Sequence, residues 1–265
     1  MLWSMDAFQA ILLGVTQGLT EFLPVSSSGH LALLETFMGL KIVPRDLLSF
    51  DVILHAGTAL ALLVCYRRQW ISILSSPFKK NGQRRLLGLL ILASIPGAAA
   101  GILFDDAIAG SFRSVQSVAA ALFVTGLVLL LAHRERGDDT IKNLKGGSAI
   151  SIGFAQALAL IPGISRSGMT ISAGQLLGMK RKEALDFSFL MAFPIIVGAS
   201  VFTGKDIITG KVLLPASQIL IIGFIASFFA SIFAILILRK FVVKHSLAWF
   251  SLYLIPVSLV LFFSS

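Results

Sequence analysis

The segment QGLTEFLPVSSSGH (residues 17–30) interrupts an apolar run with an amide, a carboxylate, three adjacent serine hydroxyls and an imidazole. A second segment, QALALIPGISRSGMT (residues 156–170), repeats this plan 139 residues later. Each begins with Gln, continues with a proline, and then carries a Ser-x-Ser-Gly run. Polar and ionisable groups are costly inside a bilayer, so their presence in a membrane-embedded stretch indicates a functional site.

The chain around these segments has the composition of a membrane protein. Of its 265 residues, 56% are hydrophobic and only 13% are charged, whereas soluble domains carry about 25% charged residues. Six apolar runs approach the roughly 20 residues that a spanning helix needs. These runs are residues 50–66, 86–104, 115–132, 184–202, 212–238 and 247–263. The sequence therefore predicts an all-α polytopic membrane protein with six transmembrane helices.

Two further apolar runs, residues 5–23 and 148–161, have a different form. Each breaks at Pro and Gly and resumes only briefly, over residues 31–40 and 171–179. Backbone that is not helical is tolerated at membrane depth only where it is buried in protein or lines a polar cavity. We therefore predict that both are re-entrant helical hairpins rather than full spans.

The basic residues test this topology, because Lys and Arg collect in cytoplasmic loops. With both hairpins re-entrant, sixteen Lys and Arg lie on the cytoplasmic side, five lie outside, and Arg166 lies within the membrane. If either hairpin is counted as a full crossing, the basic loops no longer fall on the same side of the membrane. The net charge of +9 is then explained by membrane orientation, and nucleic acid is not an expected partner.

The chain divides near residue 138 into two halves, each with one hairpin and three spans. We predict a first repeat over residues 1–138 and a second over residues 139–265, together forming one membrane domain. Because three spans are an odd number, the two halves have opposite orientations. Such an inverted-topology repeat, with broken helices at matching positions, places the hairpin tips together near the bilayer centre.

The first segment carries the groups of an activated nucleophile. Gln17 and Glu21 lie four residues apart and share a helix face. Pro24 ends that helix, and the serines lead into a second short helix that begins near His30. A helix N-terminus with free N–H groups attracts anions, and the hydroxyls add donors. A serine beside an imidazole and a carboxylate can be activated for attack.

The second segment adds a permanent positive charge. The guanidinium of Arg166 is suited to phosphate oxygens, and at membrane depth it needs an anionic partner. By topology the candidates for that partner are Glu21 and a bound phosphate. Helix–helix packing is the alternative explanation for serine clusters in a membrane, but two matching segments with complementary charges favour a phosphate site.

The candidate residues fall into two groups. The catalytic candidates are Glu21, Ser27, His30 and Arg166. The substrate-binding candidates are Gln17, Ser26, Ser28, Gly29, Gly163, Ser165, Ser167 and Thr170. Asp51, His55, Asp186 and Glu35 are weaker cases: Asp51 and Asp186 lie near span ends, where capping or interface exposure is expected, and His55 lies one turn after Asp51, to which it can bond.

No set of His, Cys, Asp and Glu has the spacing of a metal site, so no protein metal ligand is predicted. One Glu with a Gln four residues before it is a poor cage for a hard cation. A divalent ion is expected to arrive bound to substrate phosphates.

The motifs closely resemble the signatures of the bacterial undecaprenyl-diphosphate phosphatase family, the integral-membrane type also associated with bacitracin resistance. The matching segments are Gln17-x-x-x-Glu21, residues 24–30 and residues 162–170. The similarity extends over the whole chain, including its length and the spacing of its spans.

This resemblance implies hydrolysis of undecaprenyl diphosphate to undecaprenyl phosphate and phosphate, which recycles the lipid carrier of peptidoglycan synthesis. It also implies a requirement for Mg²⁺ or Ca²⁺ and a bacterial inner-membrane location, with the reaction centre open to the periplasm. The family's functional residues map onto Glu21, Ser26, Ser27, His30, Ser165, Arg166 and Thr170. The family has Glu or Gln at position 17, and with Gln17 a mechanism needing two carboxylates on that helix is not expected.

The attacking group stays open at this stage. We favour Ser27 as nucleophile, with Glu21 and His30 moving protons; His30 itself or a water activated by Glu21 are the rivals. A transporter or flippase of lipid phosphates is the alternative function. The expected partners are a prenyl diphosphate lipid and membrane lipids, and a homodimer stays open.

Overall fold

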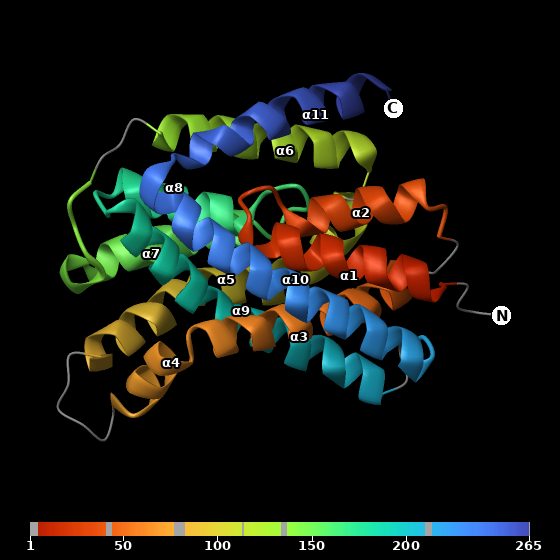
Figure 1. Ribbon diagram of the computed structural model, residues 1–265, viewed down its shortest axis with the longest axis horizontal. Helices are drawn as coiled ribbons and strands as arrows, with labels where there is room; N and C mark the ends of the chain where they lie inside the picture. Colours follow the sequence, from red (N-terminus) through yellow and green to blue (C-terminus); the bar gives the residue numbers. More distant parts are fainter. Residues whose placement is uncertain are drawn as a thin grey trace.

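The computed structural model describes residues 5–40, 44–76, 83–112, 114–133, 137–209 and 214–264 (Figure 1). Over these ranges the chain is helical, and its β-type pairing is a single bridge between Asp139 and Met179. Some residues used above lie outside the described ranges: the predicted span start Val212 and the basic residues Lys41, Lys79, Lys80, Arg113, Arg134, Arg136 and Lys211.

The first predicted hairpin consists of α1 (Ala7–Phe22) and α2 (Ser27–Phe37). Helix α1 ends two residues before Pro24, as predicted. Helix α2 begins earlier than the predicted start near His30, because the Ser26 hydroxyl accepts the Gly29 N–H and caps the first turn. The serines thus belong to the helix N-terminus and not to a separate turn.

The second hairpin uses the same device. It consists of α7 (Gly146–Leu158) and α8 (Arg166–Leu176), and the Ser165 hydroxyl caps α8 by accepting the Gly168 N–H. The four hairpin helices have 16, 11, 13 and 11 residues, which is too short for a full crossing. Their lengths agree with re-entrant hairpins.

The spans are α3 (Pro44–Cys65), α5 (Gln83–Ser111), α6 (Val115–Ala132), α9 (Arg181–Ile208), α10 (Ser217–Lys244) and α11 (Ser251–Ser264), the last preceded by the 3-10 turn η3 (Leu247–Phe250). Five of these spans are long and apolar enough to cross a membrane. Helix α3 makes the sixth when it is taken with α4 (Arg67–Leu74), to which it is bent by 82°. The predicted all-α fold is confirmed, with five helices long and apolar enough to span a membrane, or six if α3 and α4 form one broken span.

Two short helices were not expected from the sequence. Helix α4 occupies the start of the predicted loop after Tyr66, and it buries Trp70 and Ile73 while Ile71 stays exposed. The 3-10 helix η2 (Ile141–Asn143) precedes α7. An eight-residue amphipathic helix of this kind escapes a search for long apolar runs.

The spans surround the hairpins so that the two tips meet. Helix α10 runs beside α1 and α3, α9 packs on α3, α11 covers α6, and α5 packs on α7 (Figure 1). At the tips, a Cβ placed on Gly29 would lie 3.0 Å from the Gly163 Cα. Gly163 has φ +97°, a conformation that glycine adopts readily. The two segments singled out in the sequence are therefore in direct contact.

A buried aromatic cluster lies beside the hairpin contact. The ring of Phe22 meets Phe189 edge-on at 5.1 Å between centroids, and Tyr66 meets the same ring at 6.1 Å. All three side chains are almost fully buried, whereas large apolar side chains such as Phe8 and Phe263 are exposed on the outer surface. An apolar exterior of this kind fits a surrounding bilayer.

Helix α1 is joined closely to α10 through small residues. A Cβ on Gly18 would lie 2.5 Å from the Ser227 carbonyl oxygen and 2.7 Å from the Ala230 Cβ. Gly14 makes the same kind of approach to Gly223 one turn earlier. Small residues four apart let two membrane helices approach closely, which fixes α1 and therefore Glu21.

We predict that Gly18→Ala destabilises the protein by about 1–3 kcal/mol, because the added methyl group overlaps backbone that cannot move aside. The measurement is the thermal unfolding midpoint in detergent. Gly88→Ala is the matched control, because Gly88 is an exposed residue of α5 and a Cβ added there would have no neighbouring atom within 4 Å. Equal midpoints for the two variants would contradict the close α1–α10 contact.

Candidate active site

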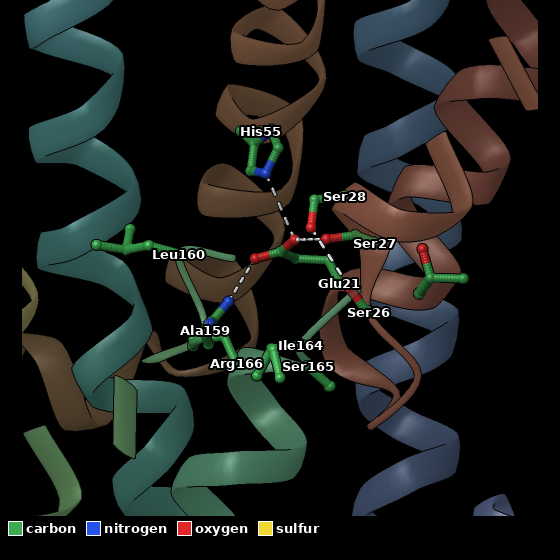
Figure 2. Close-up of a pocket in the computed structure, with 11 residues that line it drawn as sticks. Glu21, Ser26, Ser27, Ser28, His55, Ala159, Leu160, Ile164, Ser165 and Arg166 are labelled. Atoms are coloured by element: carbon green, nitrogen blue, oxygen red, sulfur yellow. Dashed lines mark hydrogen bonds and ion pairs between the residues drawn. The ribbon is translucent and has the colours of Figure 1, made fainter. Parts of the chain in front are cut away.

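A pocket of about 220 Å³ opens where the hairpin tips meet. Its walls come from α1, α2, α3 and the turn between α7 and α8, as Figure 2 shows. The lining residues are Thr20, Glu21, Ser26, Ser27, Ser28, His55, Ala159, Leu160, Ile164, Ser165 and Arg166. Hydroxyls, one carboxylate, one imidazole and one guanidinium thus face a common space within an otherwise apolar protein.

Glu21 is the centre of this pocket (Figure 2). Its Oε1 forms an ion pair with Arg166 Nη2, which joins the first hairpin to the second. Its Oε2 accepts a hydrogen bond from Ser27 Oγ at 2.6 Å and another from Gln17 Nε2 at 3.1 Å. The predicted shared face of Gln17 and Glu21 and the predicted partner of Arg166 are both observed.

These contacts orient the Ser27 hydroxyl. Because a carboxylate only accepts hydrogen bonds, the Ser27 proton points to Glu21 and the oxygen lone pairs are left for other atoms. Arg166 retains donor capacity, since its Nη1 makes no hydrogen bond to any residue in the described ranges. A hydroxyl oxygen and an under-used guanidinium therefore lie on either side of one buried carboxylate.

His55 also belongs to the pocket, although the sequence ranked it as a weaker case. Its Nε2 lies 3.5 Å from Glu21 Oε2. Its Nδ1 lies 2.7 Å from the Asp51 backbone carbonyl oxygen, so the expected bond to Asp51 exists, through the main chain. A histidine inside a predicted span was the available signal; its proximity to Glu21 depends on how α3 packs against α1.

His30 lies behind the serine turn and is not among the residues that line the pocket. Its Nδ1 is 2.7 Å from the Ser26 carbonyl oxygen, and its Nε2 is 2.8 Å from the Tyr253 hydroxyl of α11. Ser26 has φ +72°, a strained value for a residue with a side chain. The His30 contact therefore holds the backbone that precedes Ser27.

The second tip is fixed by hydrogen bonds to α6 and α1. The Thr125 hydroxyl accepts the Ser165 N–H at 3.1 Å and lies 3.2 Å from the Gly163 carbonyl oxygen, to which it donates. The Ser167 hydroxyl donates to the Leu23 carbonyl oxygen at 3.0 Å. Ser167 thus ties the second hairpin to the end of α1, close to Glu21.

The substrate-binding candidates therefore divide by position. Those that line the pocket are Ser26, Ser28 and Ser165. Those that lie behind its wall are Gln17, Gly29, Gly163, Ser167 and Thr170. The Thr170 hydroxyl bonds to the Arg166 carbonyl oxygen at 2.8 Å and to the Ser188 hydroxyl at 2.6 Å. Its hydroxyl supports α8 and does not face the pocket.

Asp186 belongs to a separate polar cluster. It accepts from the Tyr66 hydroxyl at 2.6 Å and pairs with Lys182 at 2.9 Å, while Arg239 Nε lies 3.7 Å away. This cluster joins the junction of α3 and α4 to α9 and α10. Asp186 thus has a packing role in addition to its place near a span end.

The residues of the pocket do not fit a resident cation. Among the described residues no group of three or more His, Cys, Asp or Glu side chains could hold a metal ion. Glu21 is the one carboxylate among the lining residues, and both of its oxygens already accept from Arg166 and Ser27. A hard cation prefers six or more oxygen ligands, which this set does not supply.

Comparison with known proteins agrees with the motifs. Residues 10–260 match the family described as bacitracin resistance protein BacA. The undecaprenyl-diphosphatase of Christiangramia forsetii is 40% identical over 96% of this chain and 97% of its own. Those of Gemmatimonas aurantiaca and Carboxydothermus hydrogenoformans are 39% and 38% identical, over 97% and 94% of both chains. Matching nearly end to end, the chain belongs to the bacitracin resistance protein BacA family.

Proposed function

We propose that this protein hydrolyses undecaprenyl diphosphate to undecaprenyl phosphate and inorganic phosphate. The observation that carries the proposal is the meeting of Ser27, Glu21 and Arg166 in one pocket between the hairpin tips. The relatives named undecaprenyl-diphosphatase support it over nearly the whole chain. Recycling of the peptidoglycan lipid carrier, and hence bacitracin resistance, follows from this reaction.

The diphosphate group binds, in this proposal, between the N-termini of α2 and α8. Both helices begin at the pocket, and their first N–H groups and dipoles favour an anion. Arg166, which lines the pocket, contacts the phosphate oxygens with its guanidinium, and the Ser28 hydroxyl adds a donor. Fixed donors of this kind stabilise the charge that develops on a transferred phosphoryl group.

Ser27 is the proposed nucleophile. Its Oγ attacks the terminal phosphorus, Glu21 Oε2 accepts the Ser27 proton, and the bond to the bridging oxygen breaks, which releases prenyl phosphate. Water then hydrolyses the phosphoserine. Ser27 is favoured over His30 because both ring nitrogens of His30 are engaged with Ser26 and Tyr253.

An apolar cavity next to the pocket supports a place for the prenyl tail. It has a volume of about 400 Å³ and lies between α5 and α9. Leu160 lines both this cavity and the polar pocket. Small residues such as Gly97 and Gly198 form its walls, which leaves room for a branched hydrocarbon chain.

We predict that Ser27→Ala lowers phosphate release from farnesyl diphosphate in detergent by about 10³-fold or more, because the attacking oxygen is removed. The measurement is colorimetric phosphate release, with gel filtration as a check of folding. Ser151→Ala, at an exposed position of α7, is the control and keeps normal activity. Near-normal release by Ser27→Ala would leave a Glu21-activated water as the attacking group.

The same assay separates hydrolysis from the alternative of a lipid-phosphate transporter or flippase. Detergent solution has no sidedness, so a transporter alone releases no phosphate. No observation on the described residues favours transport, and the names of the relatives favour hydrolysis.

The diphosphate is proposed to bring its divalent cation, Mg²⁺ or Ca²⁺, with it. The described residues of the pocket do not offer enough ligands to hold a free cation, and this supports entry of the cation together with the substrate. The proposed location is the bacterial inner membrane, with the pocket open to the periplasm, as the resemblance to the undecaprenyl-diphosphate phosphatase family implies.

EDTA is expected to abolish phosphate release from farnesyl diphosphate and to leave the thermal unfolding midpoint of the substrate-free protein unchanged. The reason is that the cation, in this proposal, enters with the substrate and is not held by the free protein. Both are measured in the same detergent, and excess Mg²⁺ should restore release. A lower midpoint in EDTA would instead indicate a cation bound by the protein.

A further inference from the structure

Two histidines near the pocket are anchored in the same way. His30 Nδ1 lies 2.7 Å from the backbone carbonyl oxygen of Ser26, and His55 Nδ1 lies 2.7 Å from that of Asp51, in each case four residues earlier. A carbonyl oxygen only accepts hydrogen bonds, so Nδ1 carries a proton in both rings. Proton exchange is therefore left to Nε2 in each histidine.

The environments of the two Nε2 atoms differ. His30 Nε2 is engaged by the Tyr253 hydroxyl at 2.8 Å and lies outside the pocket lining. His55 Nε2 lies 3.5 Å from Glu21 Oε2, and His55 lines the pocket with 29% of its side chain exposed. Figure 2 shows the His55 ring on the opposite side of the Glu21 carboxylate from Arg166. His55 is thus placed to exchange a proton with a molecule in the pocket.

The proposed reaction needs two proton-transfer groups. One must take the proton of Ser27, and Glu21 already receives that hydrogen bond. The other gives a proton to the leaving oxygen as its bond to phosphorus breaks, and Glu21 cannot do both at once. Among the lining residues, the remaining polar side chains are hydroxyls, the permanently charged Arg166 and the imidazole of His55. Imidazole is the side chain most often used in general acid–base catalysis.

We propose that His55 is a catalytic residue that acts first as the acid and then as the base of the pocket. This inference rests on the proposed function. The scheme starts from a protonated His55 and a charged Glu21. As Ser27 Oγ bonds to the terminal phosphorus, its proton passes to Glu21, the bond from phosphorus to the bridging oxygen breaks, and that oxygen takes the proton of His55 Nε2.

The second half of the reaction restores both groups. Water attacks the phosphorus of phosphorylated Ser27 and gives one proton to neutral His55. The bond between phosphorus and Ser27 Oγ breaks, and Oγ takes its proton back from Glu21. The sum is one water consumed and one prenyl phosphate and one phosphate formed, with His55 protonated and Glu21 charged as at the start.

The test compares the purified wild-type protein with His55→Gln, using release of phosphate from farnesyl diphosphate in detergent between about pH 5 and pH 9, the range around the ordinary pKa of histidine. We expect kcat to fall by about 10²–10⁴-fold, the usual contribution of general acid–base catalysis. KM is expected to change less than about threefold, because the lost interaction forms only in the transition state.

The pH profile distinguishes catalysis from a structural role. We expect wild-type kcat to decline toward high pH, because the acid step needs a protonated His55, and we expect the His55→Gln profile to lack that decline. The charged groups facing His55 in the pocket are Glu21 of α1 and, beyond it, Arg166 of α8, and both are unchanged in the variant. His133→Gln, at the exposed end of α6, is the matched control and keeps the wild-type profile.

Three results overturn parts of this scheme separately. Near-normal kcat in His55→Gln, or a change confined to KM, overturns the role of His55 and leaves the proposed function standing. A wild-type pH profile without a decline at high pH also overturns the role of His55. This result needs no substitution, so it can be obtained even if the variant fails to fold. Absence of phosphate release by the wild-type protein overturns the proposed function itself.

Discussion

The ion pair between Glu21 and Arg166 is the constraint on which the rest of the site depends. Each charge would be costly in an apolar protein core if its partner were missing, so the two hairpins that carry them must meet. Their meeting brings the Ser27 hydroxyl and the start of α8 to one pocket. A pair that links two separate hairpins therefore sets both the packing and the charge pattern of the site.

Small residues make this meeting geometrically feasible. Gly29 and Gly163 allow the tips to touch, while Gly14 and Gly18 allow α10 to lie close against α1. The strained turn at Ser26 is held from behind by His30, which is itself bonded to Tyr253 of the last helix. Elements from both ends of the chain thus cooperate to position one serine hydroxyl.

Much of this was predictable from local pattern. The apolar runs predicted where the spanning helices lie, and the Pro and Gly breaks predicted the two broken segments, because the bilayer restricts which segments can cross it. The four-residue spacing predicted the Gln17–Glu21 contact. His30 and Thr170 show where prediction from local pattern fails. Their sequence neighbours suggested that both line the pocket, but the packing of α11 and α9 gives their side chains other partners.

The sequence by itself determined the membrane character, the helical fold and the two broken segments. It also placed one negative and one positive charge, Glu21 and Arg166, in those segments. Each of these features depends on composition or on spacing within one segment. Only the tertiary structure decided that His55 of α3 faces Glu21 and that His30, which does not line the pocket, bonds to Tyr253 of α11. The physical reason is that both histidines make the same local bond to the main chain, so only the helices packed around them determine what their second nitrogen meets.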